Sequence, residues 1–312
     1  MLGFIARRLL TMVPVLLLIT LFVTALIDLT PGDPVLQIIG ADVQPGQVEE
    51  TRELLGLNDP FVVRWGRYVW GILRGDLGYS FLNGRPVAAD LLNRFPNTFK
   101  LALFSTIVAT LIGIPLGIYA ATKQFTWKDN AAMFLALFFV SMPTFWFALL
   151  LVRFFSVQLR WLPAMGVESW RGFILPVVVL SLNAAAVITR QMRSNLLEVI
   201  RQDFMTTARS KGLHERKVLY KHGLKNAVIP VIQVIGGIFA QMLSGALINE
   251  VIFSIPGVGQ YALNGLRGRD YPVIQGSVVF FAVLSIIVIL LIDISFAYVD
   301  PRIRSQFSGK KR

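Results

Sequence analysis

Long apolar runs, separated by polar segments of unequal length, are the main pattern along this chain. A helix needs about 20 apolar residues to cross a hydrocarbon layer about 30 Å thick, and six runs come close to that length. They lie at residues 9–29, 98–122, 131–157, 173–189, 228–253 and 276–298. The pattern therefore predicts an all-α integral membrane protein with six transmembrane helices, which form a single membrane domain over residues 1–312.

Composition agrees with this prediction. Of the 312 residues, 55% are apolar and 15% are charged, and the mean hydropathy is +0.64, whereas soluble domains are less apolar and more charged. The first run follows Arg7 and Arg8 in the manner of a secretory signal, but its apolar part is too long and no small-residue cleavage pattern follows, so we expect a spanning helix. The chain has no cysteine, which excludes disulfides and thiolate metal sites.

The distribution of Lys and Arg predicts the orientation, because positively charged loops tend to stay in the cytoplasm. Eighteen of the thirty lie before the first run, between the second and third, between the fourth and fifth, or after the sixth. Both termini are therefore expected inside, with a cytoplasmic tail at 299–312. This topology also explains the net charge of +12; nucleic-acid binding would need a recognition module that the sequence lacks.

The outer segment at 31–97 is too long to be a simple connection. Within it, PGQVEETRELLG predicts a short helix with Pro45 near its start and Gly56 beyond its end. The stretch PFVVRWGRYVWGILRG predicts a second helix that lies along the membrane interface, either as an anchor or as a docking surface for an external partner. Its apolar face consists of Phe61, Trp65, Val69, Ile72 and Leu73.

A second outer segment, at 254–275, separates the last two runs. Pro256, Gly257 and Gly259 permit a tight reversal of the chain. A short helix would follow before Pro272, and its one side would carry Tyr261, Leu263 and Leu266. This piece either dips back as an outer gate or forms a plain structured loop.

An inner polar segment at 190–227 separates the fourth and fifth runs. The residues predict Asp203 as the N-cap of a helix over 204–211, with Gly212 as its left-handed end. A second amphipathic piece, ERKVLYKHGLKNAVIP, leads into the fifth run. The segment therefore contains two short helices separated by a glycine.

These two helices need a surface to pack on, because short helices are marginal alone. Phe204 and Ala208 share one face by their spacing, and Leu213 can fold back under them. The surface is either the inner end of the bundle or another protein. Nine Lys or Arg against three acids would also attract anionic lipid, but lipid explains the charge and not the glycine-separated helices.

Several kinds of chemistry find no support in the sequence. No G-x-x-x-x-G-K-[ST] motif is present to cradle nucleotide phosphates, so ATP would have to be bound elsewhere. His214 and His222 lie in the inner segment without the H-E-x-x-H spacing of a zinc hydrolase. We therefore expect a non-catalytic chain with no metal site and no cofactor of its own.

A proton-coupled secondary transporter is the rival class, and a membrane scaffold without a pathway is a third. Proton coupling needs ionisable groups deep in the bilayer. The candidates lie near the ends of the runs: Asp28, Lys100, Arg153, Glu250 and Asp293. Uptake driven by an ion gradient without ATP would identify that class.

The inner segment resembles the cytoplasmic "EAA" loop of ABC-importer permeases. The resemblance rests on Thr206-Thr207-Ala208, three further residues and Gly212, between the fourth and fifth of six spans. It implies a coupling helix seated in a groove of a separate ATPase subunit. The residues implied in coupling are Asp203, Thr206, Thr207, Ala208, Arg209, Lys211, Gly212 and Leu213. Where the general pattern has Ile-x-Leu-Pro, this chain has His-Gly-Leu-Lys at 222–225, a variant typical of one branch.

That branch is the dipeptide, oligopeptide, glutathione and nickel permease family, which the sequence resembles along nearly its whole length. The matching motifs are RRLL (7–10), PGDP (31–34), LGLNDP (55–60), GDLGYSF (75–81), RPV (85–87), SMPTFW (141–146), WLPAMG (161–166), ARSKGL (208–213), HGLKNAVIP (222–230), IPGVGQ (255–260), RDYPVIQ (269–275) and DPRIR (300–304).

The resemblance implies a permease subunit in the cytoplasmic (inner) membrane of a bacterium or archaeon. Its partners would be a second permease, two ATPase subunits that bind ATP and Mg, and an extracytoplasmic binding protein that delivers short peptides. Nickel chelates and glutathione are the alternative substrates.

Two sets of residues in the spans are candidates for contacts within such an assembly. Small residues let helices approach closely, which predicts packing against the second permease through Gly236, Gly237, Ala240, Ser244 and Gly245. Polar side chains could instead face a wet pathway or form part of a gate: Asn183, Gln233, Gln241 and Asn249, together with Pro256, Gly257 and Gly259 of the outer segment.

Overall fold

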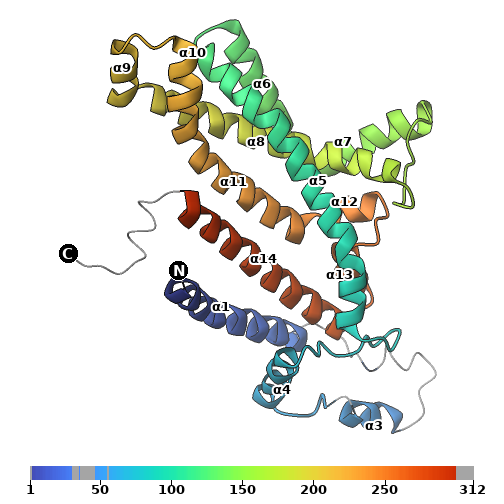
Figure 1. The fold of residues 1–312 in the computed structure, drawn as a ribbon. Helices are drawn as coiled ribbons and strands as arrows, with labels where there is room; N and C mark the ends of the chain where they lie inside the picture. Colours follow the sequence, from blue (N-terminus) through green and yellow to red (C-terminus); the bar gives the residue numbers. More distant parts are fainter. Residues whose placement is uncertain (1, 30–34, 36–45, 55, 300–312) are drawn as a thin grey trace. The chain divides into compact units, whose positions relative to one another are not determined.

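The computed structural model describes residues 2–29, 35, 46–54 and 56–299, and most of these residues are helical (Figure 1). The β structure among the described residues consists of one isolated antiparallel bridge between Tyr79 and Pro86. The predicted all-α class is therefore confirmed. The predicted tail beyond residue 299, Pro45 and the PGDP motif lie outside the described residues.

The chain divides into two compact units. The first comprises Met1–Thr98 and Pro256–Ile287, and the second comprises Phe99–Ile255 and Val288–Arg312. The helices of the first unit are α1 (Leu2–Leu29), α3 (Gln47–Leu54), α4 (Phe61–Leu73), the start of α5 (Val87–Thr122), α13 (Val258–Arg267) and most of α14 (Tyr271–Val299).

The two predicted outer helices, α3 and α4, are both present in the first unit. Gly56 follows α3 with φ +63°, as expected for a residue beyond a helix end. The indole N–H of Trp65 on α4 donates to Thr20 Oγ1 of α1 at 3.1 Å. On the predicted apolar face of α4, Trp65 is partly buried and Leu73 is 73% exposed.

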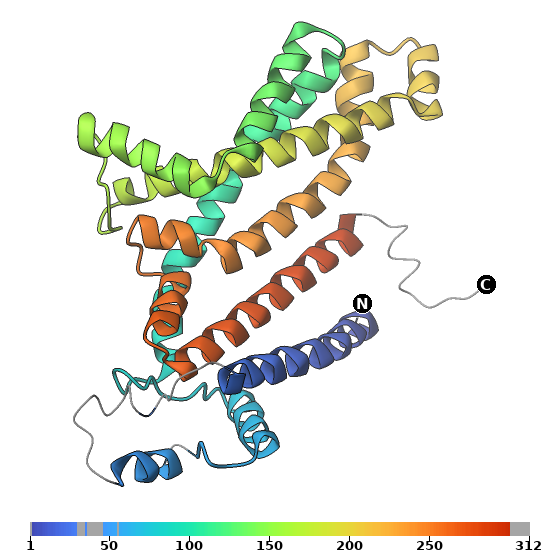
Figure 2. The same cartoon turned by 180° about the vertical axis from the view of Figure 1, so that it is seen from behind.

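The second unit holds the end of α5, α6 (Trp127–Ser141), α7 (Thr144–Leu151), the π-helix η1 (Val152–Gln158), the 3₁₀-helix η2 (Trp170–Phe173), α8 (Ile174–Ile200), α9 (Asp203–Ser210), α10 (Glu215–Lys217), the π-helix η3 (Val218–Gly223), α11 (Leu224–Gly245) and α12 (Leu247–Ile252). The long helix α8 runs through the unit, with α7 near its start and α9 beyond its end (Figure 2). Its buried residues include Leu175, Val179 and Ile188.

The predicted third span is not one helix, because Pro143 divides it. Met142 is extended, as a residue before proline tends to be, and α6 and α7 meet at 97°. Pro143 has no N–H, so the carbonyl of Phe139 loses its intrahelical donor. Asn183 of α8 replaces that donor, with Nδ2 at 3.1 Å from the Phe139 oxygen.

Other helices exceed their predicted spans, because hydropathy marks the part in hydrocarbon and not where helical backbone begins. α5 starts at Val87 and not at 98, α14 starts at Tyr271 and not at 276, and α8 continues to Ile200, well past 189. Conversely, the predicted fifth span is broken at Ala246, which separates α11 from α12.

Four described helices are long and apolar enough to cross a membrane: Val87–Thr122, Trp170–Ile200, Glu215–Ser244 and Tyr271–Ile294. The bent pair Trp127–Ser141 and Thr144–Gln158 is a fifth candidate, and α1 has a shorter apolar stretch, Leu10–Leu26. The chain is thus a multi-pass helical membrane protein.

Two glycines of α5 let it lie directly against α8. A Cβ on Gly113 would come within 2.7 Å of Ile188 Cβ, and one on Gly117 within 2.6 Å of Met192 Cβ. Sequence reasoning sought small-residue packing in the fifth span and missed this pair, although its four-residue spacing is the usual signal.

Gly117→Ala should therefore lower the thermal unfolding midpoint of the detergent-solubilised chain, because overpacking costs about 1–3 kcal/mol. Gly237→Ala is the matched control, since its added Cβ has no atom within 4 Å; alanine favours a helix over glycine, so its midpoint should hold or rise. Equal midpoints for the two variants would contradict the close approach.

Candidate functional site

The predicted coupling segment forms a small structure at the end of α8, opposite α7 (Figures 1 and 2). α9 begins at Asp203, and the extended residue Gln202 is its N-cap, with no side-chain capping bond. The prediction of Asp203 as the N-cap was therefore wrong by one position. In the first turn, the Asp203 carboxylate still favours the helix because it faces the positive end of the helix dipole.

One face of α9 is buried against its own chain. Met205 is fully buried and Ala208 is 7% exposed, and both pack with Val218 of η3. Leu213 packs against this cluster, as predicted. Phe204 was predicted on the buried face but is 42% exposed, because the i,i+3 pair formed by Met205 and Ala208 sets the inward direction.

Two glycines shape the segment. Gly212 has φ +73° and its N–H donates to the Arg209 carbonyl at 2.9 Å, so the predicted left-handed end is confirmed. Gly223 of η3 lies under Met205, whose Cε would be 3.1 Å from an added Cβ. The absence of a side chain at 223 therefore lets α9 seat closely on η3.

Arg209 and Glu215 join the two short helices across the glycine turn. Arg209 Nε lies 3.1 Å from Glu215 Oε2, and Nη2 lies 2.9 Å from Oε1. This two-pronged hydrogen bond raises the pKa of Arg209 above its usual value. The sequence did not reveal the pair, because its six-residue spacing crosses a turn and matches no helical period.

The remaining coupling candidates lie on the outside of α9. Thr206, Thr207 and Lys211 are exposed. Thr207 Oγ1 donates to the Asp203 carbonyl at 3.0 Å, which stabilises the first turn. The segment thus has an anchored apolar face and a free face with one aromatic and several polar groups.

The structure separates the four polar residues predicted for the pathway. Asn183 is bonded to the α6 backbone, and Asn249 is only 3% exposed. Gln233 and Gln241 on α11 are exposed. The sequence did not distinguish the buried or bonded asparagines from the exposed glutamines, because the exposure of each side chain depends on which neighbouring helices cover it.

The small residues of α11 are mostly covered within the chain. A Cβ on Gly236 would lie 2.5 Å from Ile292 side-chain atoms, and Ala240 is 8% exposed. Ser244 Oγ donates to the Ala240 carbonyl at 3.3 Å. Gly237 is exposed. Gly245 is not among the residues whose exposure the structure describes.

The predicted outer segment contains α13, which is held to the end of the first unit's part of α5. Asn97 Nδ2 donates to the Pro256 carbonyl at 3.1 Å, and Thr98 Oγ1 accepts from the Val258 N–H at 2.9 Å. Gly257 is extended and Gly259 is buried in the first turn of α13, so neither supplies the predicted reversal; the positive φ near this turn occurs at Ser254.

On the predicted face of α13, Tyr261 is buried but Leu266 is 59% exposed. Val258, Tyr261 and Gly265 form the buried side instead. Leu266 follows Gly265 by one position, so it points to a different side of the helix.

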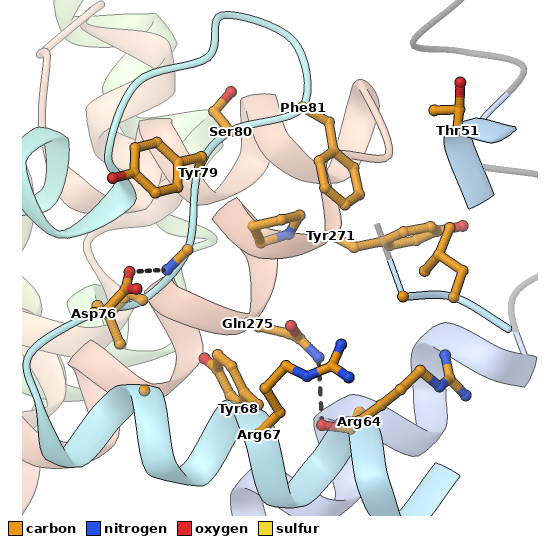
Figure 3. Close-up of a pocket in the computed structure, with 17 residues that line it drawn as sticks. Thr51, Arg64, Arg67, Tyr68, Asp76, Tyr79, Ser80, Phe81, Tyr271 and Gln275 are labelled. Atoms are coloured by element: carbon orange, nitrogen blue, oxygen red, sulfur yellow. Dashed lines mark hydrogen bonds between the residues drawn. The ribbon is translucent and has the colours of Figure 1, made fainter. Parts of the chain in front are cut away.

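The first unit also contains a pocket of about 630 Å³ between α1, α4 and the start of α14 (Figure 3). Arg67 on its wall is paired with Asp59, and Gln275 Nε2 lies 3.3 Å from Thr24 Oγ1. Burial raises the pKa of Tyr68, another wall residue. The Gln275–Thr24 contact therefore joins α14 to α1, while the Arg67–Asp59 pair ties α4 to the connection before it.

The family follows from matches over most of the chain. A family model described as the inner membrane component of binding-protein-dependent transport systems matches residues 113–305, and the model for its N-terminal part matches residues 1–102. The chain belongs to this family. It is a permease subunit of an ABC importer and a multi-pass inner membrane protein, which decides against the proton-coupled and scaffold alternatives.

Similar proteins include permeases with named substrates. This permease is 39% identical over 304 residues to the glutathione transport system permease protein GsiC of Salmonella paratyphi A, covering 97% of this chain and 99% of that protein. It is 37% identical over 332 residues to the dipeptide transport system permease protein DppB of Alkalihalophilus pseudofirmus, covering 97% and 100%.

Solved structures share the fold at low sequence identity. The inward-facing MetNI methionine ABC transporter aligns with a TM-score of 0.58 at 18% identity, over 67% of this permease and 96% of that chain. An amino acid ABC transporter crystallised with histidines aligns with a TM-score of 0.53 at 17% identity, over 67% and 94%.

Proposed function

We propose that this permease imports short peptides together with a second permease, two ATPase subunits and an extracytoplasmic binding protein. Six spans with both termini inside account for the four long apolar helices, the bent α6–α7 pair and the apolar stretch of α1. The distribution of Lys and Arg supports the same orientation. ATP hydrolysis then belongs to the partner ATPases.

The observation that carries the coupling part of the proposal is the two-sided character of α9. Its inner face is anchored by Met205 and Ala208, while Phe204 remains exposed in a strongly polar segment. Exposed aromatic side chains that enter a partner's pocket are common sources of binding energy in protein interfaces. The free face of α9 is therefore suited to a groove on an ATPase subunit.

The contacts of α9 with η3 and with the turn around Gly212 would transmit a displacement of α9 to the membrane helices. Met205 of α9 and Leu196 of α8 both approach Gly223 of η3, and the Arg209–Glu215 bond holds the turn around Gly212. The permease pair would change between an inward-open and an outward-open state. Closure of the ATPase subunits would drive this change if the closed ATPase binds one of the two states more tightly than the other. α13, with Pro256 to Gly259 at its start, is the proposed outer gate.

Short peptides are the substrate class supported by the relatives. The similar proteins include a dipeptide permease and a glutathione permease, and glutathione is itself a tripeptide. Both names therefore describe one chemical class, small solutes with amide bonds and free carboxylates.

The test is uptake by proteoliposomes that contain the whole assembly, with ATP on the ATPase side. Radiolabelled dialanine, glutathione and a nickel–histidine chelate are offered separately with the binding protein. Uptake of either peptide that requires ATP supports the proposal. Uptake of the chelate alone, or peptide uptake driven by a proton gradient without ATP, would overturn it.

Phe204→Ser should weaken binding of the ATPase subunit by about tenfold or more, because it removes the exposed anchor of α9. The binding constant can be measured with the permease in nanodiscs. Phe125→Ser is the matched control, since Phe125 is an exposed aromatic (87%) in a different inner connection. Equal binding by both variants would remove α9 from the interface.

A further inference from the structure

Two glutamine side chains on α11 are not explained by packing within the chain. Gln233 and Gln241 are exposed, and neither side-chain amide has a hydrogen-bond partner among the residues that the structure describes. Of the polar residues predicted for the pathway on α8, α11 and α12, Asn183 and Asn249 are engaged or buried. The two glutamines are therefore the ones left to face something outside this chain.

The two amides lie on the same side of the helix, about 80° apart around its axis. They are eight residues apart, which at 1.5 Å per residue places them ~12 Å apart along α11 and close to the same face. Gly237 lies midway, is exposed, and has no atom within 4 Å of an added Cβ. The helix surface at Gly237, midway between the glutamines, is therefore not covered by any residue that the structure describes.

Neither lipid nor a closely packed helix suits this face. An amide in hydrocarbon has no hydrogen-bond partner, which is unfavourable. Close helix packing uses small residues, but Gly236 and Ala240 are already covered within the chain, and two long glutamines would hold a neighbouring backbone away. A water-filled space that takes up a polar solute fits the arrangement better.

We propose that Gln233 and Gln241 are two amide contacts for the backbone of a short extended peptide in transit, an inference that rests on the proposed import of peptides. Each glutamine amide has two donors and a carbonyl acceptor, so it can pair with a peptide bond whatever the side chains are. At about 3.3–3.6 Å per extended residue, ~12 Å corresponds to three or four residues. Because the contacts are neutral, they bind weakly enough for the peptide to move on.

The absence of cysteine makes a labelling test direct. Gln233→Cys and Gln241→Cys, each in the full assembly in proteoliposomes, are treated with a hydrophilic methanethiosulfonate reagent. The probes are trialanine and 8-aminooctanoic acid, which has the same number of main-chain atoms but no peptide bond. Leu111→Cys is the control, because Leu111 is an exposed apolar residue (69%) within the span of α5 and should not react.

The proposal expects both cysteines to react, trialanine to slow the reaction, and 8-aminooctanoic acid to leave it unchanged. Reaction without protection by trialanine overturns the proposal, and if the wild-type assembly still imports peptides, the proposed function stands. A lack of reaction combined with a disulfide to a second permease assigns the face to the permease interface and also overturns it. Absence of both wild-type peptide uptake and protection overturns the two proposals together.

A second measurement separates substrate contact from a structural role. Gln233→Met and Gln241→Met keep the side-chain length but remove the amide, and each should raise the half-saturating trialanine concentration for uptake about fivefold, the effect of one lost hydrogen bond. The neighbouring Ile232→Leu should leave that concentration unchanged. A fall in maximal rate with an unchanged half-saturating concentration would show a structural role and contradict the proposal.

Discussion

Gly212→Pro is expected to reduce ATP-driven uptake roughly tenfold or more while the chain still enters the membrane. Gly212 has φ +73°, whereas proline fixes φ near −65° and has no N–H. The substitution therefore removes the left-handed end of α9 together with the hydrogen bond to the Arg209 carbonyl. Residues 213–217 would take a new course, and the Arg209–Glu215 bond would be lost.

The measurement is the number of peptides imported per ATP hydrolysed by the reconstituted assembly. Gly212→Asn is the matched control, because asparagine tolerates the left-handed conformation better than other residues with a side chain. It should retain most of the uptake. Normal uptake by the proline variant would mean that α9 does not transmit work from the ATPase.

Asp129→Ala is expected to cost about 1–3 kcal/mol of stability, because it leaves the partly buried guanidinium of Arg193 without its hydrogen-bonded carboxylate. Asp129 is 2% exposed, and its two carboxylate oxygens each lie 2.6 Å from a nitrogen of Arg193. It also accepts the Phe125 N–H at 3.3 Å. The single bond pair thus ties the start of α6 to α8 and to the connection before α6.

This loss can be measured as the free energy of unfolding in a denaturing-detergent titration. The double variant Asp129→Ala with Arg193→Met is the control, since it removes both charges and leaves no uncompensated guanidinium. It should be less destabilised than Asp129→Ala alone. A double variant at least as destabilised as Asp129→Ala alone would show that the two residues do not act as a pair.

Much of the local structure of the proposed coupling site could be predicted because its signals are local. Gly212 ends a short helix, and Leu213 folds back under it, for reasons that depend on a few neighbouring residues. The error at Asp203 is one of boundary, which shifts by a residue or two between definitions. Which face of α9 is buried was harder to predict, because that face is set by packing on Val218 and Gly223 of η3. Phe204 was therefore expected on the packed face, whereas its side chain is exposed.

The break at Pro143 was also within reach of the sequence, because a proline inside an apolar run always removes one backbone bond. The sequence did not indicate the angle between α6 and α7. It also did not indicate that Asn183 would bond the free Phe139 carbonyl, since Asn183 lies about forty residues further along the chain. The ion pair between Asp129 and Arg193 could not be predicted for the same reason. The two residues are 64 positions apart, so no helical spacing relates them.

The sequence by itself determined the membrane class, the family and the place of the short helix proposed for coupling, because hydropathy, charge and helix-ending glycines act over short distances. The tertiary structure alone decided which polar and small residues remain uncovered. Asn183 is hydrogen-bonded, and Asn249 and Gly236 are covered, inside the chain, while Gln233, Gly237 and Gln241 are left exposed. Exposure depends on which helices pack together, and that packing follows from contacts between residues far apart in the sequence.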